Sequence, residues 1–383
     1  MPPPVKNAPN GNTLKLNKIL TILYISLTTI GLVLTYISRE NFSREGFEAP
    51  FPPTVLFLEN FYQIVLHALS CFNLMKLTFF KSDSYFEFYQ NISLMNERLK
   101  ISDLYHKTKV ILISLYPIVV IIHTVIDICS RTQTAGMYLQ HVLLKLVQRF
   151  QNNIMTFIIF MNLFNIKYQL ETNRRTLFVE MEKRRCSTLK MGTKRNWISV
   201  GSERVLRILK EVTCCHNEIC DSVEQFNSLF GTHLFAIVFC SFFNLMLQAA
   251  ILEKHLLYSG VLEKYKNDNT ELLRRFYFSI ITVASLMLLA WICADTVEEG
   301  KKLKTTCLKY IKILPALPDS KIDKLTKECL INLKKQAESR TPQLSAAGYF
   351  TVDYEMLTKF VSALTTNLIV IFQFLRNGGQ NSE

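Results

Sequence analysis

Seven long apolar stretches divide this chain of 383 residues, and each is long enough to cross a membrane. A helix that crosses about 30 Å of hydrocarbon needs about 20 mostly apolar residues. The stretches cover residues 16–38, 54–80, 109–129, 137–166, 230–257, 274–297 and 348–375. Alternating strand patterns are missing, and only helices or closed barrels satisfy every backbone polar group in lipid. The chain is therefore predicted to be an all-α protein with seven transmembrane helices.

The distribution of basic residues predicts how these helices are oriented. With seven spans, one set of loops and flanks carries 31 Lys and Arg residues and the opposite set carries 9. Cytoplasmic loops carry the excess of basic residues, which predicts a cytoplasmic N-terminus and an extracellular C-terminus. This orientation is opposite to that of a G-protein-coupled receptor. It places Asn41 of the sequon Asn41-Phe42-Ser43 outside, as the predicted glycosylation site, and the second sequon at Asn91 inside.

Several function classes are disfavoured by the same sequence. The net charge of +13 is explained by basic cytoplasmic loops facing anionic lipid, so nucleic acid is not an expected partner. No metalloprotease motif, nucleophile elbow or phosphate-binding loop is present, and the chain is predicted not to be an enzyme. His216 and Cys220 share a helical face, but no second Cys/His pair follows at ligand spacing. We therefore predict neither a metal site nor a cofactor.

Polar side chains inside the predicted spans suggest a ligand-binding site. Charged groups in a bilayer are costly and normally face protein or water. In the stretch 137–166 such groups recur at helical spacing, and polar groups on neighbouring spans lie at compatible depths. The candidate ligand-binding residues are His123, Asp127, His141, Lys145, Gln248 and Tyr277. Two interpretations remain open, a water-filled pocket that opens to the outside and a polar contact between helices.

The last apolar stretch carries a narrow stripe of small polar residues. Steps of three or four positions connect Thr358, Ser362, Thr365 or Thr366, Ile369 and Gln373, which places them on one helical face. Hydroxyl and amide groups can partly solvate cations in a pore, and an aliphatic ring can close it by excluding water. Small polar residues also permit close helix packing in membranes, and the periodicity alone favours that second interpretation.

The end of the chain resembles a known receptor family. Thr366-Asn367, five apolar residues and Gln373-Phe374 resemble the closing signature of insect gustatory receptors, which reads Thr-Tyr, five apolar residues, Gln-Phe. The segment Gly348-Tyr349-Phe350-Thr351-Val352-Asp353 is similar to the lead into the last helix of that family. The segment from His216 to Gly231, with Phe226-Asn227 and Phe230-Gly231, is similar to the family's approach to the fifth span.

This resemblance implies a ligand-gated, non-selective cation channel in which four subunits, identical or related, surround a central pore. Its partners would be a small-molecule tastant and membrane lipid, in the plasma membrane of sensory neurons. Residues 1–347 would form the ligand-binding helical bundle with cytoplasmic anchor loops at 167–229 and 298–347. Residues 348–383 would form the pore-lining helix and a short outer tail. The expected pore and gate residues are Thr366, Ile369, Val370, Gln373 and Phe374.

Two departures from the family pattern bear on the ligand and on the gate. Asn367 replaces the family Tyr, and Leu368 stands where sugar-sensing members often carry Glu. We therefore expect a non-sugar, bitter-type tastant. The alternative function is a secondary transporter of a small solute, because Lys145 and Arg149 lie within a predicted span. Transporters of this kind are built from paired halves with broken helices, and here Pro117 alone interrupts a span.

Overall fold

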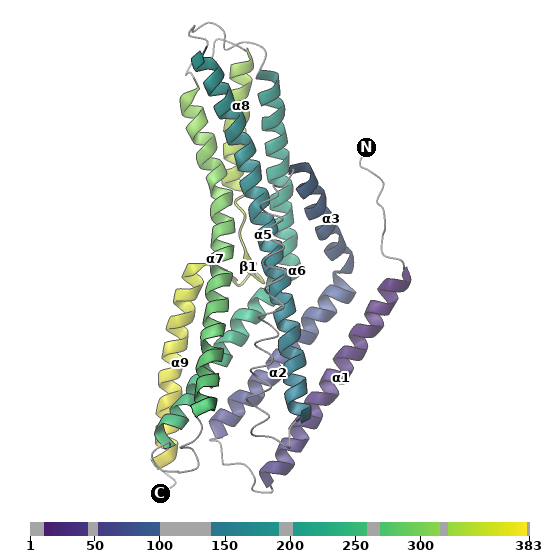
Figure 1. Ribbon diagram of the computed structural model, residues 1–383, viewed down its shortest axis with the longest axis vertical. Helices are drawn as coiled ribbons and strands as arrows, with labels where there is room; N and C mark the ends of the chain where they lie inside the picture. Colours follow the sequence, from purple (N-terminus) through teal and green to yellow (C-terminus); the bar gives the residue numbers. More distant parts are fainter. Residues whose placement is uncertain are drawn as a thin grey trace.

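Helices make up nearly all of the computed structural model, which describes residues 11–44, 53–99, 139–190, 202–258, 269–314 and 321–380. Side chains at some helix ends, including residues 34–44 and 139–150, lie outside this description. The helices are α1 (Gly11–Arg44), α2 (Pro53–Met75), the π-helical turn η1 (Lys76–Phe80), α3 (Ser82–Leu99), α5 (Leu139–Lys190), α6 (Ser202–Tyr258), α7 (Asn269–Ile313), α8 (Lys321–Ser339) and α9 (Tyr354–Gln380). A hairpin of β1 (Ser345–Ala346) and β2 (Phe350–Thr351) precedes α9 (Figure 1).

Most of the predicted spans coincide with apolar helices. In the described part of the chain, four helices are long and apolar enough to cross a membrane, and a shorter apolar helix covers Asn17–Val33. The four are Asn60–Phe80, Glu203–Glu253, Arg275–Ile313 and Tyr354–Gln373. From residue 139 on, the stretch 137–166 is helical within α5, whereas its first two residues and the stretch 109–129 lie outside the described residues. A nearly all-helical fold with several apolar helices is therefore confirmed, while the count of seven spans and the side of each terminus stay predictions.

Large apolar side chains are exposed on several helices. On α1 and α7 they include Ile19, Leu27, Ile30, Leu273, Ile280 and Met287, each more than half exposed. Soluble monomers rarely expose contiguous apolar faces of this kind. These faces are therefore suited to contact with lipid.

Ion pairs show that α5 and α7 run in the same direction. The pairs are Lys167 with Asp295, Arg174 with Glu299 at 3.3 Å, and Glu182 with Lys309 at 3.1 Å. In two of these the partners are 125 and 127 positions apart in sequence, and an offset that stays nearly constant requires parallel helices. Helix α6 runs in the opposite direction beside them (Figure 1).

The upper ends of α5, α6 and α7 join α8 in a four-helix bundle (Figure 1). Its buried core includes Leu177, Leu209, Leu303, Tyr310, Leu330 and Leu333. Helix α5 alone has 52 residues, so it is about 78 Å long, much longer than the hydrocarbon thickness of about 30 Å. Much of the predicted polar stretches 167–229 and 298–347 is thus helix that continues from the apolar segments. In this bundle hydrogen bonds from Lys309 and Tyr310 lower the pKa of Glu182.

A second core lies where α3 packs on α5 and α6. Its largest fully buried side chains include Phe88, Phe226 and Phe230, whose rings lie 5.1 to 6.4 Å apart between centroids. Ring pairs at this spacing add favourable contacts to the burial of their area. This aromatic cluster fixes the part of α6 on which the hairpin rests.

Candidate functional site

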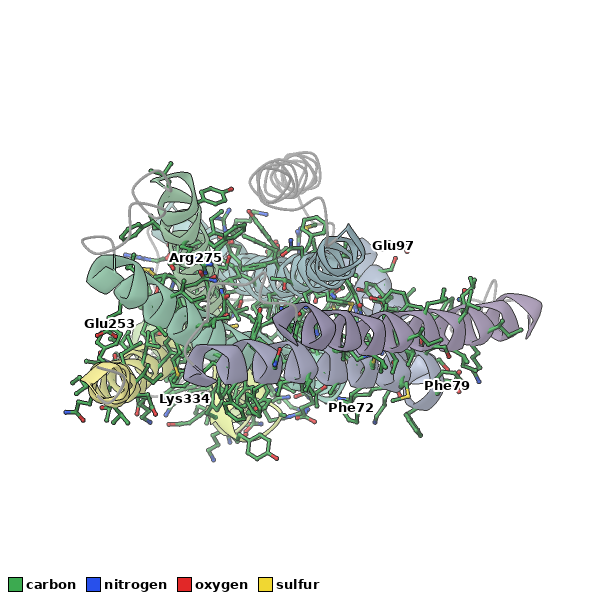
Figure 2. All side chains as sticks on the ribbon, turned by 90° about the horizontal axis from the view of Figure 1, so that it is seen from below. Phe72, Phe79, Glu97, Glu253, Arg275 and Lys334 are labelled. Atoms are coloured by element: carbon green, nitrogen blue, oxygen red, sulfur yellow. The ribbon has the colours of Figure 1, made fainter. Side chains whose placement is uncertain are left out.

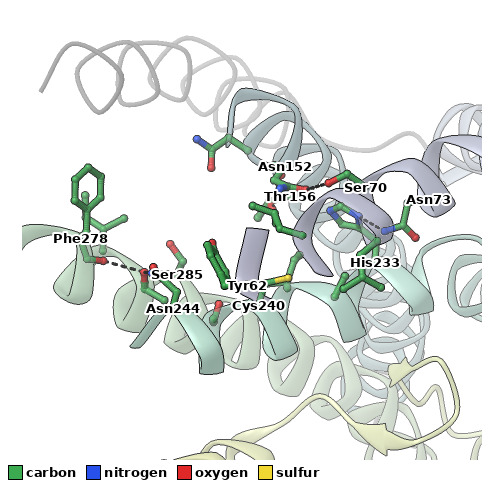
Figure 3. A pocket seen from close by; sticks show the side chains of 18 residues that line it. Tyr62, Ser70, Asn73, Asn152, Thr156, His233, Cys240, Asn244, Phe278 and Ser285 are labelled. Atoms are coloured by element: carbon green, nitrogen blue, oxygen red, sulfur yellow. Dashed lines mark hydrogen bonds between the residues drawn. The ribbon is translucent and has the colours of Figure 1, made fainter. Parts of the chain in front are cut away.

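A cavity of about 180 Å³, with many polar side chains in its wall, lies between α2, α5, α6 and α7 (Figure 3). Six of its lining residues are apolar: Leu66, Leu69, Ala236, Ile237, Phe278 and Ile281. Most of the others carry hydroxyl, amide or imidazole groups: Tyr62, Ser70, Asn73, Asn152, Asn153, Thr156, His233, Ser241, Asn244, Thr282 and Ser285. None of the 18 lining residues is Asp, Glu, Lys or Arg. The cavity is therefore suited to a neutral molecule that forms hydrogen bonds.

Hydrogen bonds hold several lining side chains in place. The Asn73 amide lies 3.0 Å from His233 Nδ1, and Figure 3 shows these two groups at the α2 wall of the cavity. Ser70 Oγ donates to Asn152 Oδ1 at 3.3 Å, which links α2 to α5. Asn244 Nδ2 donates to Thr282 Oγ1 at 3.1 Å, which links α6 to α7. The cavity is thus bordered by side chains whose positions the neighbouring helices fix.

Of the predicted ligand-binding residues, Gln248 and Tyr277 lie near this cavity without lining it. Gln248 is buried, donates to Asn244 Oδ1 at 3.3 Å and accepts a hydrogen bond from Arg275 Nη1 at 3.1 Å. The ring of Tyr277 lies 5.5 Å from the ring of Phe278, which is a lining residue. Both residues therefore support lining side chains. Arg275, on the first part of α7, is the last residue of this hydrogen-bonded series (Figure 2).

The other four predicted ligand-binding residues are not placed by the structure. His123 and Asp127 lie outside the described residues, and so do the side chains of His141 and Lys145 on the first turns of α5. Further along the same helix, Asn152, Asn153 and Thr156 line the cavity. A role for the polar face of 137–166 in ligand binding stays a prediction.

Sequence reasoning did not single out Asn73 or His233. Both are buried, at 4% and 3% exposure, and both come from helices α2 and α6, which are long and apolar. The available signal was the isolation of each polar residue within an apolar run, because such a residue needs a partner in a membrane. No local spacing connects the two, since they are 160 positions apart.

The hairpin before α9 explains the first glycine of the segment Gly348–Asp353. Strands β1 and β2 pair antiparallel, with Ser345 opposite Thr351 and Ala346 opposite Phe350. The two turn residues Ala347 and Gly348 have φ angles of 54° and 81°. Two positive φ angles are typical of the type I′ turn of short hairpins, which favours glycine. The stretch 348–375 is therefore not a continuous helix, and its first residues form this turn.

The hairpin docks on α6 at the other segment that resembles the family. A Cβ atom on Gly231 would lie 3.0 Å from the backbone nitrogen of Ala347, so a larger residue would require the turn to shift. The side chain of Asn227, one helical turn earlier, donates to the Gln343 carbonyl at 2.7 Å and accepts from the Ser345 N–H at 3.0 Å. The segment from His216 to Gly231 thus holds the residues that lead directly into Gly348–Asp353.

Helix α9 begins directly after the hairpin and buries only one side. Asp353 accepts a hydrogen bond from the Met356 N–H at 2.9 Å, as an N-cap residue does. Leu364, Leu368, Ile371 and Phe372 pack against a cluster on α6, which includes Met246, Leu247 and Ala250. The opposite side is open, and α9 lies at the edge of the helix array, away from α1 (Figure 2).

The predicted pore residues that the structure describes lie on this open side. Ile369 and Val370 are 54% and 43% exposed, and Thr366 and Gln373 are exposed as well. The hydroxyl of Thr366 donates to the Ser362 carbonyl at 3.0 Å. It therefore keeps lone pairs that can accept hydrogen bonds from outside. The side chain of Phe374 lies outside the described residues.

Asn367, which replaces the family Tyr, bonds within its own helix: its amide donates to the Ala363 carbonyl at 2.8 Å. Among the described residues there is no group of three His, Cys, Asp or Glu side chains that could hold a metal ion. His216 and Cys220 lie within 3.7 Å of one another in the buried face of α6.

Comparison with known proteins was made for sequence and for structure. The family model of the 7tm chemosensory receptors matches residues 2–375. The fold is similar to that of the insect olfactory receptor OR5 from Machilis hrabei, with a TM-score of 0.59 and 12% identity. That match covers 94% of this chain and 88% of the receptor. The complex of the same receptor with eugenol gives a TM-score of 0.56, at the same identity and coverage.

No curated protein sequence matches the chain. The structural likeness, at 12% identity, shows a shared fold, while the sequence model spans nearly the whole length of the chain. The resemblance to insect chemoreceptors that the sequence predicts is confirmed by both. This chain belongs to the 7tm chemosensory receptor family.

Proposed function

We propose that the chain is a subunit of a ligand-gated, non-selective cation channel and acts as a gustatory receptor for a non-sugar, bitter-type tastant. The observation that carries this proposal is the open side of α9, where Ile369, Val370 and Gln373 face away from the subunit. In a monomer Ile369 and Val370 could face lipid, but the Gln373 amide would lie there without a partner. In a four-fold assembly each would form a ring around a shared axis.

The assembly is a homo- or hetero-tetramer of such subunits. The N-terminus is cytoplasmic, the C-terminus is extracellular, and Asn41 carries a glycan. The protein resides in the plasma membrane of sensory neurons. Support for a small-molecule ligand comes from the uncharged cavity between α2, α5, α6 and α7. The olfactory receptor of similar fold has been solved in complex with eugenol, which shows that this fold can hold a small molecule.

The gate is tested by two substitutions on α9. Val370→Ser should raise the basal current, because a hydroxyl ring is easier to wet than an aliphatic one. Gln373→Ala should change the relative permeability to Na⁺, K⁺ and Ca²⁺, because the amide ring replaces part of a cation's hydration. Whole-cell recording from expressing cells measures both effects.

Val361→Ser provides the matched control, because Val361 is also exposed on α9 but lies more than two helical turns before Val370. Unchanged basal current and permeability in both test variants, at normal surface levels, would remove α9 as pore lining. Single-channel recording also separates the alternative, a secondary transporter, since a carrier turns over too slowly to give unitary currents.

A further inference from the structure

Four polar side chains form a hydrogen-bond chain that leads from Lys76 to the cavity. In each contact it is fixed which group donates and which accepts. Lys76 Nζ lies 3.1 Å from Thr232 Oγ1, and an ammonium group can only donate. The Thr232 hydroxyl therefore accepts from Lys76 and donates to Asn73 Oδ1, which lies 3.1 Å away. The carbonyl end of the Asn73 amide is thus occupied, and its NH₂ group faces His233 (Figure 3).

This direction fixes the tautomer of His233. The Asn73 NH₂ group can only donate, so Nδ1 of His233 must accept, at a distance of 3.0 Å. A neutral imidazole whose Nδ1 accepts carries its proton on Nε2. Among the described residues Nε2 of His233 has no hydrogen-bond partner, and the side chain is 97% buried. The hydrogen-bond chain therefore ends in an N–H donor without an acceptor among the described residues. Nε2 itself has almost no exposed surface, so a ligand in the cavity that His233 lines must uncover this nitrogen to reach it.

A buried donor without an acceptor costs about 1 to 3 kcal/mol in general, which makes such groups rare unless a ligand or water pairs with them. The dipoles of the chain also point one way, from the Lys76 ammonium group toward Nε2. Hydrogen bonds arranged in series polarise one another, and this strengthens the last donor. The site thus provides one strong, directed donor in surroundings without a charged side chain.

We infer that His233 Nε2–H is the donor that selects the ligand, and that the ligand is a small neutral molecule with a carbonyl or ether oxygen as acceptor. Lys76 acts as a positioning residue, because it sets the direction of the chain without touching the ligand. The inference rests on the proposed chemoreceptor function. It excludes permanent cations, for which the cavity lining offers no carboxylate.

Binding is tested on the purified full-length protein in detergent, with the ligand-induced rise in Tm as the readout. The probes are three pairs of similar shape: benzaldehyde and styrene, coumarin and 1,2-dihydronaphthalene, cyclohexanone and methylenecyclohexane. Benzyltrimethylammonium is the cationic probe. At least one carbonyl compound should raise Tm and bind about tenfold more tightly than its hydrocarbon partner, as one directed hydrogen bond predicts.

Three variants then locate the donor. His233→Phe should weaken binding of the carbonyl probe about tenfold, down to the affinity of its hydrocarbon partner. His233→Gln retains an N–H donor and should restore part of this difference in affinity. Lys76→Met should reduce the preference for the carbonyl probe severalfold without changing binding of the hydrocarbon. Asn162→Leu is the control, since it removes another buried amide contact, to Tyr89 Oη at 2.9 Å, away from the cavity lining.

The inference is overturned if no carbonyl compound raises Tm, if the hydrocarbons or the cation bind as tightly, or if His233→Phe leaves the preference intact. If His233→Phe lowers Tm without any ligand, the substitution has destabilised the protein. The comparison of carbonyl and hydrocarbon binding then rests on His233→Gln. Failure of the channel proposal is separate, since the basal current of Val370→Ser needs no ligand. Carbonyl-selective binding without any current would uphold the donor and refute the channel.

Discussion

The side chain of Asn227 forms hydrogen bonds with two backbone groups of the segment that leads into the hairpin. Its amide donates to the Gln343 carbonyl and accepts from the Ser345 N–H, at 2.7 and 3.0 Å. A β-strand partner would use the same two kinds of backbone group. The amide thus takes the place of a neighbouring strand, and it does so from the middle of a helix.

Replacing Asn227 with Leu should destabilise the protein, because it leaves one N–H and one carbonyl without partners. Water can replace the exposed contact to Gln343, whereas the Ser345 N–H is partly buried, so the expected loss in the free energy of unfolding is about 1 kcal/mol. The measurement is Tm in detergent. Asn91→Leu is the matched control, since it removes one longer contact to Gln225 Oε1, at 3.4 Å. Equal Tm values for the two variants would contradict the role assigned to Asn227.

Individual residues show where sequence reasoning reaches its limit. The segments around Asn227 and Gly348 were identified because their residues are close together in sequence. Their contact was not predicted, since Asn227 and Ser345 are 118 positions apart. The same holds for Asn73 and His233 in the cavity, because a hydropathy profile shows that a polar residue lies in an apolar run but not which residue it pairs with.

At the scale of elements, the start of α9 is determined by hydrogen bonds rather than by apolarity. Apolar content extends the last span back to residue 348, but positive φ angles at Ala347 and Gly348 produce a turn instead. Asp353 then accepts from the Met356 N–H and from the Thr351 hydroxyl, both at 2.9 Å. Hydropathy does not register either effect, and so the predicted span began six residues before the helix.

Asp353→Ala should loosen the first turn of α9 by about 1 kcal/mol, the usual cost of losing an N-cap. The carboxylate also interacts favourably with the positive end of the helix dipole. Hydrogen exchange of the amides at 354–358, read by mass spectrometry, measures the change.

Asp353→Asn is the control for this prediction, because Asn caps helices about as well as Asp while removing the charge. It should stay close to the wild type. Unchanged exchange in the alanine variant would show that tertiary contacts, rather than the cap, hold the first turn of α9.

At the scale of the whole molecule, the long helices extend the membrane part into a second, polar part. Sequence reasoning located the polar stretches 167–229 and 298–347 but treated them as anchor loops. Except for the separate helix α8, their helices are continuous with the apolar segments, and all of them pack around Leu209, Leu303 and Leu333. The apolar runs were predictable because the bilayer sets their length, whereas the bundle depends on contacts between segments far apart in sequence.

The end of α5 and the start of α8 lie together at the far end of this bundle (Figure 1). Epitope tags after Lys190 and before Lys321 should therefore report the same side of the membrane. The excess of basic residues predicts the cytoplasm. Antibody labelling of intact and permeabilised cells measures this, and labelling of intact cells would reverse the proposed orientation.

Glycosylation provides an independent check of the same orientation. Treatment with a glycosidase should shift the mobility of the wild type but not of Asn41→Gln. A glycan on Asn91 instead would place α3 on the outside, and with it the bundle.

The docking of the hairpin on α6 also has a consequence for biosynthesis. Asn227 leaves the ribosome 118 residues before its partner Ser345. At about 5 to 20 residues per second, roughly 6 to 24 seconds pass before the hairpin can be made. During that time the turn cannot pack against Gly231, and the side-chain amide of Asn227 has not yet met Gln343 and Ser345. A nascent chain that stalls before residue 343 therefore lacks both hydrogen bonds of the Asn227 side chain, and α6 must hold its place without them.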